Sequence, residues 1–325
     1  MKVSVSVITY NQEDYIAQAL DSVLMQETDF EFEILIGEDD SSDGTRAIVK
    51  DYQRRHPSRI RLLLNDRKDV IYINGRATGR WNFINNLNNA RGTYIALLEG
   101  DDYWSDPLKL QKQADFLDQN ADCSACFHWV QWLDQSLEEI AEAKYGPSVV
   151  QSRYVLDDLL RNGNFISTCS LMFRNRYPET LPAWYYGIPV GDLPLHILNA
   201  KEGAIGLIDE TMAVYRRHEG GIYGGQSEVD NCNVALETYA VLGASLGLSR
   251  KRSFRSGVLR WETRLVNAHR EQGRLMDALL AGWRAVKVAP GNKKLRTLAE
   301  VTVACLPARL RGRVRRMVQH RKQRP

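Results

Sequence analysis

The chain of 325 residues is long enough to bury one large core and to carry a smaller appended unit. Hydrophobic residues make up 44% of it and charged residues 26%, which is typical of a soluble globular protein and excludes a fibrous or low-complexity chain. The formal net charge of +3 is unevenly distributed, because eight Arg and Lys and no acid lie between positions 309 and 324, leaving 35 of the 43 basic residues against 40 acidic ones in the body. An acidic body without a recognition motif disfavours nucleic acid as a partner.

The first third of the chain alternates apolar strands with amphipathic helices. Strands are expected at Val3–Ile8, Phe32–Gly37, Ile60–Leu64 and Tyr94–Leu98, and helices at about Asp14–Met25 and Thr45–Arg55. This order predicts an α/β fold with a Rossmann-like, mostly parallel sheet covered by helices on both faces.

The middle of the chain is less regular, and its last part is helical. Strands are expected at Ala125–Trp132 and Cys169–Phe173, a loop leading into a helix over 184–200, and a final strand pair over 203–221. Residues 271–292 resemble one helical hairpin of a tetratricopeptide-type repeat. The sequence predicts three parts: a main domain over 1–230, a helical extension over 231–307 and a basic tail over 308–325.

Acidic residues follow two of the predicted strands. Glu38, Asp39 and Asp40 end one, and "EGDD" at 99–102 ends another. Ligands of open α/β sheets bind at the carboxyl ends of strands, and Mg²⁺ takes one or two carboxylates together with substrate phosphates. The first cluster also suits a turn and helix N-cap, with Asp43 or Thr45 as the cap. The second cluster has no such explanation, so it predicts a cation and a diphosphate.

These motifs resemble the family 2 glycosyltransferases with a GT-A fold. The similarity lies in "VSVITYNQEDYIAQALDSVLMQ", "GEDDSSDGT" and "ARGTYIALLEGDDYWSDPLKLQKQ", and it extends over residues 1 to about 221. It implies a nucleoside-diphosphate sugar as the donor.

The resemblance also assigns the donor site. It implies a nucleoside pocket at Thr9, Tyr10, Asn11 and Glu13, with Asp39 accepting a hydrogen bond from the base, which favours UDP or dTDP. Glu99 stands where the family has its first Asp, and Asp101 would face the ribose or the sugar. Asp102 would bind Mg²⁺ or Mn²⁺, which assists the departure of a diphosphate.

A base and a loop residue complete the implied site. Asp192 in "VGDLPLHIL" aligns with the family's catalytic base, and a single base opposite the leaving group implies inversion at the anomeric carbon. From the residues alone, Asp192 also suits a helix N-cap. His218, near a Gly-rich loop, matches a family position beside the diphosphate, although a lone His is also often structural.

Several further side chains allow either a functional or a structural interpretation. Arg80 and Arg91 could reach phosphate, but we expect both to be solvated. Ser167 and Thr168 resemble acceptor-side contacts. Aromatic residues at 184–186 could stack on sugars or fill the core.

The rest of the sequence shows neither a clear targeting segment nor a second metal-binding motif. The N-terminus lacks the apolar core of a signal peptide, and the five cysteines offer one C-x-x-C without the ligands that complete a zinc site. The expected location is the cytoplasm, peripheral at most on the inner face of the plasma membrane. The basic tail suits either an amphipathic helix on an anionic membrane or a solvated, disordered segment.

The sequence therefore predicts a metal-dependent, inverting glycosyltransferase that acts on a saccharide or a lipid-linked saccharide in surface polysaccharide synthesis. One alternative is a nucleotidyltransferase, which would need a basic, Gly-rich phosphate loop after the first strand. Another is a non-catalytic saccharide- or partner-binding protein on the same fold. No G-x-G-x-x-G follows the first strand, which disfavours a dehydrogenase.

Overall fold

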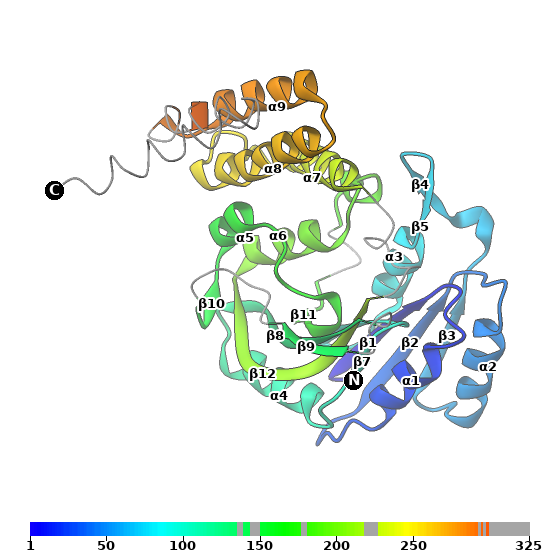
Figure 1. Cartoon of the computed structure of the whole chain (residues 1–325). Helices are drawn as coiled ribbons and strands as arrows, with labels where there is room; N and C mark the ends of the chain where they lie inside the picture. Colours follow the sequence, from blue (N-terminus) through cyan, green and yellow to red (C-terminus); the bar gives the residue numbers. More distant parts are fainter. Residues whose placement is uncertain are drawn as a thin grey trace. The chain divides into compact units, whose positions relative to one another are not determined.

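The computed structural model describes residues 1–134, 139–143, 150–176, 181–217 and 227–291, together with 294, 297 and 298. The chain divides into two compact units, Met1–Gly224 (unit 1) and Gly225–Pro325 (unit 2) (Figure 1). His218 and the basic tail lie outside the described residues, so the predictions on them stay predictions.

The first half of the unit 1 sheet is parallel. Strand β1 (Val3–Thr9) lies between β2 (Phe32–Glu38) and β6 (Tyr94–Glu99), and β3 (Ile60–Leu64) pairs with β2. Its helices are α1 (Ile16–Leu24), α2 (Thr45–Arg55) and α3 (Arg80–Asn89). The strand-and-helix order predicted for this region is confirmed.

Helices cover both faces of this half, and β1 shows how. Its Val3, Val5 and Val7 are fully buried in one core cluster with residues of α1 and α2. On the opposite face, Asn86 of α3 donates a hydrogen bond to Ser6 Oγ (3.0 Å). Because strand side chains alternate between faces, the Val-Ser repeat produces one apolar and one hydrogen-bonded face.

The second half of the sheet is mixed. Strand β8 (Cys123–Asp134) runs parallel to β12 (Ala204–Arg217), whereas β11 (Met172–Arg174) is antiparallel to both β6 and β8. The long path is β10-β12-β8-β11-β6-β1-β2-β3, and β7 (Tyr103–Trp104) and β9 (Glu139–Ala143) pair with β12 and β8; β10 is Arg153–Tyr154. The α/β class is confirmed, and β11 makes the sheet more mixed than the strand order predicts.

The final strand pair expected over 203–221 is wrong. Ala204–Arg217 form a single strand, β12, whose register against β8 shifts between Ile208 and Thr211. Asp209 and Glu210 lie at this irregularity, where a bulge inserts polar residues without ending the strand. Likewise, the segment expected as a strand from Cys169 begins with a 3₁₀ turn, η2 (Thr168–Ser170), before β11.

The remaining elements of unit 1 connect these strands. They are η1 (Arg67–Asp69), β4 (Ile71–Ile73), β5 (Arg76–Thr78), α4 (Lys109–Gln119), α5 (Leu156–Asn162), η3 (Ala183–Tyr186) and α6 (Asp192–Glu202). Among the described residues, the four cysteines are buried and unpaired, and no helix has the length and apolar content that a membrane span requires.

Unit 2 is helical as predicted. It comprises α7 (Glu228–Ser245), α8 (Arg252–Glu271) and α9 (Leu275–Val288). The turn between α8 and α9 contains Gly273, whose φ of 74° favours glycine. The two helices form a hairpin that begins well before the expected one, because residues 271–292 hold only the end of α8, the turn and α9. Alanines on α9 pack against Leu265 and Val266 of α8.

Candidate active site

The carboxyl ends of β1, β2 and β6 meet at one edge of the sheet. Thr9 pairs with Glu38 and Ile8 with Glu99 in register. Beyond the strand ends, the Asp39 N–H donates to the Thr9 carbonyl (3.1 Å) and the Gly100 N–H to the Ile8 carbonyl (2.9 Å). A side chain at Gly100 would come within 2.9 Å of Thr9 Oγ1, so glycine allows this close approach. Both predicted acidic clusters therefore lie at one edge.

Asp39 is buried with one oxygen unused. Its side chain lies 3.5 Å from Arg67, and the Arg67 guanidinium stacks over the Tyr10 ring at 4.5 Å. The Oδ1 atom has no hydrogen-bond partner among the described residues. Burial raises the pKa of Asp39, with Arg67 opposing the rise. A ligand with an N–H donor would satisfy this oxygen.

Asn11 and Glu13, two of the predicted donor contacts, hydrogen-bond to the loop before α2. Asn11 Oδ1 accepts a hydrogen bond from the Ser42 N–H (2.8 Å), and Glu13 Oε2 accepts one from the Gly44 N–H (2.6 Å). They connect the loop after β1 to the loop before α2. Of the predicted nucleoside set, Thr9 and Tyr10 lie close to the Asp39 corner, whereas the side chains of Asn11 and Glu13 hold the two loops together.

The acidic segment after β6 forms a repulsive cluster with Asp192. Glu99 has a pKa well above its usual value, because of burial first and then the charges of Asp101, Asp102 and Asp192. Burial and the charge of Asp101 also raise the pKa of Asp102 well above its usual value. These carboxylates come from two separate segments of the chain, so their proximity is created by the fold.

The chemistry of Asp102 fits a hard cation. The backbone N–H of Arg216 on β12 donates to Asp102 Oδ1 (2.8 Å), and the buried Cys169 thiol also hydrogen-bonds to this carboxylate. No N–H or O–H group among the described residues donates to the buried Oδ2. Carboxylate oxygen is the ligand that Mg²⁺ and Mn²⁺ prefer. Within the described residues, no three His, Cys, Asp or Glu side chains form a ready-made metal site.

Asp192 lies in the first turn of α6, and Gly191 rather than Asp192 is the N-cap residue. Asn164 donates to Asp192 Oδ2 (2.5 Å), and the Leu193 N–H donates to Oδ1 (2.7 Å). His196, one turn further, is buried, which lowers its pKa to about 4 and keeps its ring neutral at pH 7. The N-cap reading of Asp192 is therefore wrong.

Arg80 corrects a second expectation. Instead of being solvated, it is buried and donates to the carbonyls of Tyr185 (2.8 Å) and Ile188 (3.1 Å). A side chain at Gly191 would lie 3.1 Å from its guanidinium, so Arg80 packs directly against the start of α6. Arg80 thus anchors the segment that carries Asp192. Arg91 is exposed, as expected.

The aromatic residues at 184–186 were expected either to stack on sugars or to fill the core, and they differ in burial. Tyr185 is buried and donates to the Gly191 carbonyl (3.0 Å), so it belongs to the packing around α6. Trp184 is half-buried and Tyr186 is exposed. Thr168 hydrogen-bonds to Glu99 and so lies at the carboxylate cluster.

Two arginines were missed by the sequence reading. Arg67 lies just after β3, and the strand-end rule that selected Asp39 also applies there. Arg216, buried beside the site, stacks over Tyr15 (4.6 Å) and donates to Gln18 (2.7 Å). It is two residues from His218, the basic residue that the sequence favoured.

Comparison with known proteins identifies the family. Residues 4–177, more than half of the chain, match the sequence model of a family described as Glycosyl transferase family 2. The chain belongs to this family.

Two relatives illustrate the range of this family. Rv1520, an uncharacterised protein of Mycobacterium tuberculosis, is 39% identical over 224 residues, which are 68% of this chain and 60% of that protein. WfgD of Escherichia coli, a UDP-Glc:alpha-D-GlcNAc-diphosphoundecaprenol beta-1,3-glucosyltransferase, is 38% identical over 110 residues, or 34% of this chain and 39% of WfgD. The aligned part thus spans less than two thirds of either relative.

Solved structures support the fold. Staphylococcus aureus TarS 1–349, in complex with UDP-GlcNAc, aligns over 94% of this chain and 90% of that one, with a TM-score of 0.56 and 17% identity. The mannosyltransferase PcManGT of Pyrobaculum calidifontis, in complex with GDP-Man and Mn²⁺, aligns over 94% and 85%, with a TM-score of 0.52 and 15% identity. The predicted GT-A fold is confirmed.

Proposed function

We propose that the chain is a metal-dependent, inverting glycosyltransferase. Its donor is a UDP- or dTDP-linked sugar, and its acceptor is a saccharide or lipid-linked saccharide in surface polysaccharide synthesis, reached from the cytoplasmic face of the membrane. The observation that carries the proposal is a pair of buried carboxylate oxygens, Asp39 Oδ1 and Asp102 Oδ2, to which no N–H or O–H group among the described residues donates. Such groups are costly unless a ligand satisfies them.

Asp39 supports the choice of base. Uracil and thymine carry an imide N–H, which can donate to the unused Oδ1. The Arg67 guanidinium, 3.5 Å from Asp39 and stacked on Tyr10, opposes the rise in the Asp39 pKa that burial causes. Tyr10 is 42% exposed and offers a ring face to the base.

Asp102 supports the metal dependence. Its Oδ2 would bind Mg²⁺ or Mn²⁺, and Asp101 would contact the ribose or the sugar. When bound, the cation supplies neutralisation of the charge that develops on the diphosphate leaving group. The Arg216 N–H fixes the other oxygen of Asp102, so the unused oxygen keeps one orientation. His218 stays a candidate phosphate contact.

Asp192 supports the transfer step. Its carboxylate would accept the proton of the acceptor hydroxyl as that oxygen attacks the anomeric carbon, while the bond to the diphosphate breaks. The Asn164 amide orients the carboxylate, and Arg80 holds the start of α6. With one base and direct displacement, the anomeric configuration inverts.

Known relatives point in the same direction. WfgD uses a UDP-sugar and a diphosphoundecaprenol-linked acceptor, TarS was solved with UDP-GlcNAc, and PcManGT with Mn²⁺. We extend these chemistries to this chain as part of the proposal.

A donor panel tests the proposal. Purified protein is incubated with UDP-, dTDP- and GDP-sugars in Mn²⁺ or EDTA, and release of the nucleoside diphosphate is measured for wild type, Asp102→Asn and Asp192→Asn. We expect slow, Mn²⁺-dependent hydrolysis of a UDP- or dTDP-sugar that both substitutions abolish. If no donor is hydrolysed and calorimetry detects no nucleotide binding in either buffer, the non-catalytic alternative is correct.

A further inference from the structure

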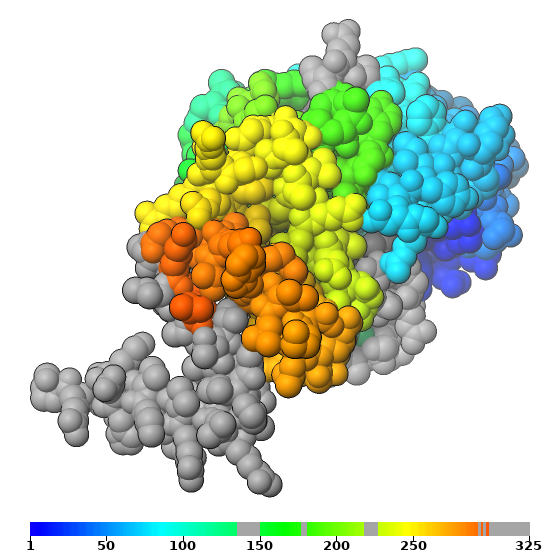
Figure 2. Space-filling view, turned by 90° about the horizontal axis from the view of Figure 1, so that it is seen from above, coloured from blue at the N-terminus to red at the C-terminus, as the bar shows by residue number. Residues whose placement is uncertain are grey.

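Helix α9 of unit 2 buries its small residues and exposes its large apolar side chains. The side chains that face the rest of the unit are small: Ala278, Ala281, Gly282 and Ala285 are buried. The large apolar side chains point outward, with exposed fractions of 71% for Met276, 45% for Leu279, 59% for Leu280 and 63% for Trp283. Figure 2 shows α9, in orange, open at the surface.

These four residues form one stripe, because their spacing of three and four places them on one side of a helix. Exposed apolar residues of unit 1, such as Leu64 and Tyr72, are instead scattered singly. Isolated exposed residues are ordinary, whereas a continuous apolar stripe marks an interaction surface.

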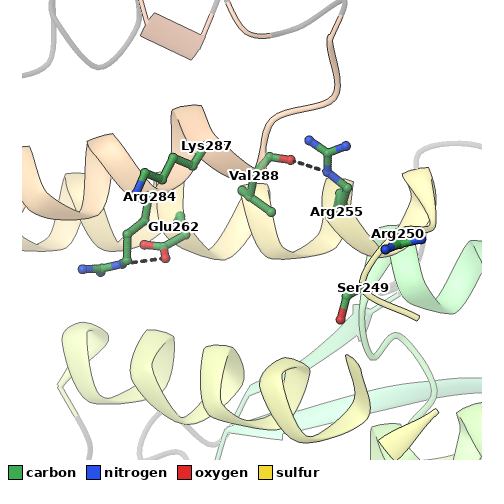
Figure 3. A pocket seen from close by; sticks show the side chains of 7 residues that line it. All are labelled: Ser249, Arg250, Arg255, Glu262, Arg284, Lys287 and Val288. Carbon is green, nitrogen blue, oxygen red and sulfur yellow. Dashed lines mark hydrogen bonds and ion pairs between the residues drawn. The ribbon is translucent and has the colours of Figure 1, made fainter. Parts of the chain in front are cut away.

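A basic pocket lies at the C-terminal end of the stripe. Its volume is about 510 Å³, and it is lined by Arg250, Arg255, Glu262, Arg284 and Lys287, with Ser249 and Val288. Figure 3 shows Arg284 and Lys287 on α9, Arg255 and Glu262 on α8, and Arg250 before α8. Four cations against one carboxylate give the lining a formal charge of +3.

The lining is organised by α8 and α9. Arg284 donates to Glu262 (2.7 Å), and Arg255 donates to the carbonyls of Val288 (3.0 Å) and Ala289 (2.9 Å). These bonds use part of each guanidinium and leave further N–H donors for an anion. Phosphate is the ligand that suits several Arg and Lys side chains best.

Lys287 connects the stripe to the pocket. It lines the pocket, and its Nζ lies 3.5 Å from the centre of the Trp283 ring. A Trp next to a Lys, at the edge of an apolar stripe, is the arrangement found at membrane–water interfaces. The sequence after α9 also contains eight Arg and Lys and no acid between 309 and 324, so the C-terminal part of the sequence has the charge that complements an anionic surface.

We propose that α9 lies in the surface of an anionic phospholipid bilayer. The stripe of Met276, Leu279, Leu280 and Trp283 enters the boundary between headgroups and acyl chains, and the basic pocket takes a lipid phosphate. This inference does not depend on the glycosyl-transfer chemistry, because it uses residues of unit 2 alone.

Vesicle flotation with the full chain tests this inference. Vesicles of phosphatidylcholine are compared with vesicles containing about a quarter phosphatidylglycerol, since each basic residue near an anionic surface adds about 1 kcal/mol. We expect the protein to float with the anionic vesicles and to be released by salt. Trp283→Ala should lower the partition coefficient about tenfold through lost apolar burial. Lys287→Gln should lower it about fivefold, the equivalent of about 1 kcal/mol.

Matched controls lie in unit 1. Tyr72→Ala removes an equally exposed aromatic ring and Lys50→Gln an exposed Lys, and neither should change flotation. Far-UV circular dichroism checks that each variant keeps its helices.

Three results would overturn the inference. Equal flotation of wild type, Trp283→Ala and Lys287→Gln would assign binding to the basic tail alone. No flotation, together with calorimetric binding of inorganic phosphate, would make the pocket a site for a free anion. No flotation, together with a dimer that Leu279→Ser/Leu280→Ser dissociates in sedimentation velocity, would make a second copy the occupant of the stripe.

Discussion

In unit 1, charged side chains lie inside the protein, whereas in unit 2 large apolar side chains lie outside it. Asp39, Asp102 and Lys109 are buried in the first unit, and Leu280 and Trp283 are exposed in the second. Both arrangements cost free energy, because charge is desolvated in one and apolar surface is hydrated in the other. Under our proposals a ligand offsets part of each cost: a cation with a nucleoside diphosphate at Asp39 and Asp102 in unit 1, and an anionic lipid surface at the stripe in unit 2.

The largest effect is expected at Asp192. Asp192→Asn removes the proposed proton acceptor and should lower the transfer rate about 100- to 10,000-fold while nucleotide affinity is kept. Steady-state kinetics and calorimetry check the two halves of this result. Glu202→Gln, on the exposed end of the same helix, is the control and should leave the rate unchanged. A rate for Asp192→Asn equal to that of Glu202→Gln would remove Asp192 from the chemistry.

A smaller effect is expected at Asp39. Asp39→Asn replaces a charged acceptor by a neutral one, and the loss of charge assistance should weaken UDP binding about tenfold. Asp40→Asn should have little effect, since Asp40 pairs with Arg46 (3.1 Å) and its positive φ of 60° is one that Asn tolerates. Calorimetry with UDP and with inorganic diphosphate measures both variants. If diphosphate binding falls as much as UDP binding, Asp39 does not contact the base.

Lys109 is a buried basic residue of unit 1 that is not part of the proposed active site. It is fully buried, donates to Gln113 (2.6 Å) and lies 3.9 Å from the Trp104 ring centre, and burial lowers its pKa to about 7. The folded pKa lies below the unfolded value, so the cost of this group is complete below pH 7 and disappears as the pH rises toward 10.5.

Lys109→Met should therefore stabilise the protein. We expect a gain on the order of 2 kcal/mol at pH 7, the removed desolvation cost less the penalty of leaving Gln113 without its donor. The gain should shrink by pH 9.5. Chemical unfolding at both pH values measures it. Lys112→Met, at a Lys that pairs with Asp106 and Glu210, is the control and should give no gain. A pH-independent effect would contradict this reading of Lys109.

The smallest effect on stability is expected on the outer face of α9. Leu279→Ser/Leu280→Ser should change the free energy of unfolding by no more than about 0.5 kcal/mol, because exposed side chains contribute little to folding. Ala281→Leu, on the buried face of the same helix, should destabilise by about 1–3 kcal/mol through overpacking. Chemical unfolding compares the two, and a large loss in the double variant would show that the stripe is part of the core.

Local patterns were enough for much of the fold. The helix Thr45–Arg55 and the strand Ile60–Leu64 have the predicted bounds, because a periodic apolar face determines each. The bulged β12 was misread as two strands, since Asp209 and Glu210 look like a turn when the partner strand is unknown. The antiparallel insertion of β11 depends on pairing across distant segments, which periodicity does not encode.

Part of the candidate site could likewise be predicted from the sequence, and part could not. The position of Asp39 and of the 99–102 segment at strand ends is enough to predict that they lie close together. Burial of Arg80 against Gly191 could not be predicted, because its carbonyl acceptors come from residues more than 100 positions later in the chain. Likewise, Asn11 and Glu13 are polar residues near the site, but only the fold reveals that they tie two loops together.

The central claim is that the carboxylates of unit 1 are completed by a cation and a nucleoside diphosphate. Calorimetric titration of UDP into wild type and Asp102→Asn, in Mn²⁺ and in EDTA, tests it most directly. We predict that EDTA weakens UDP binding to wild type at least about tenfold, and that Asp102→Asn binds UDP equally weakly in both buffers. Equal affinity of wild type for UDP in Mn²⁺ and in EDTA would contradict the account.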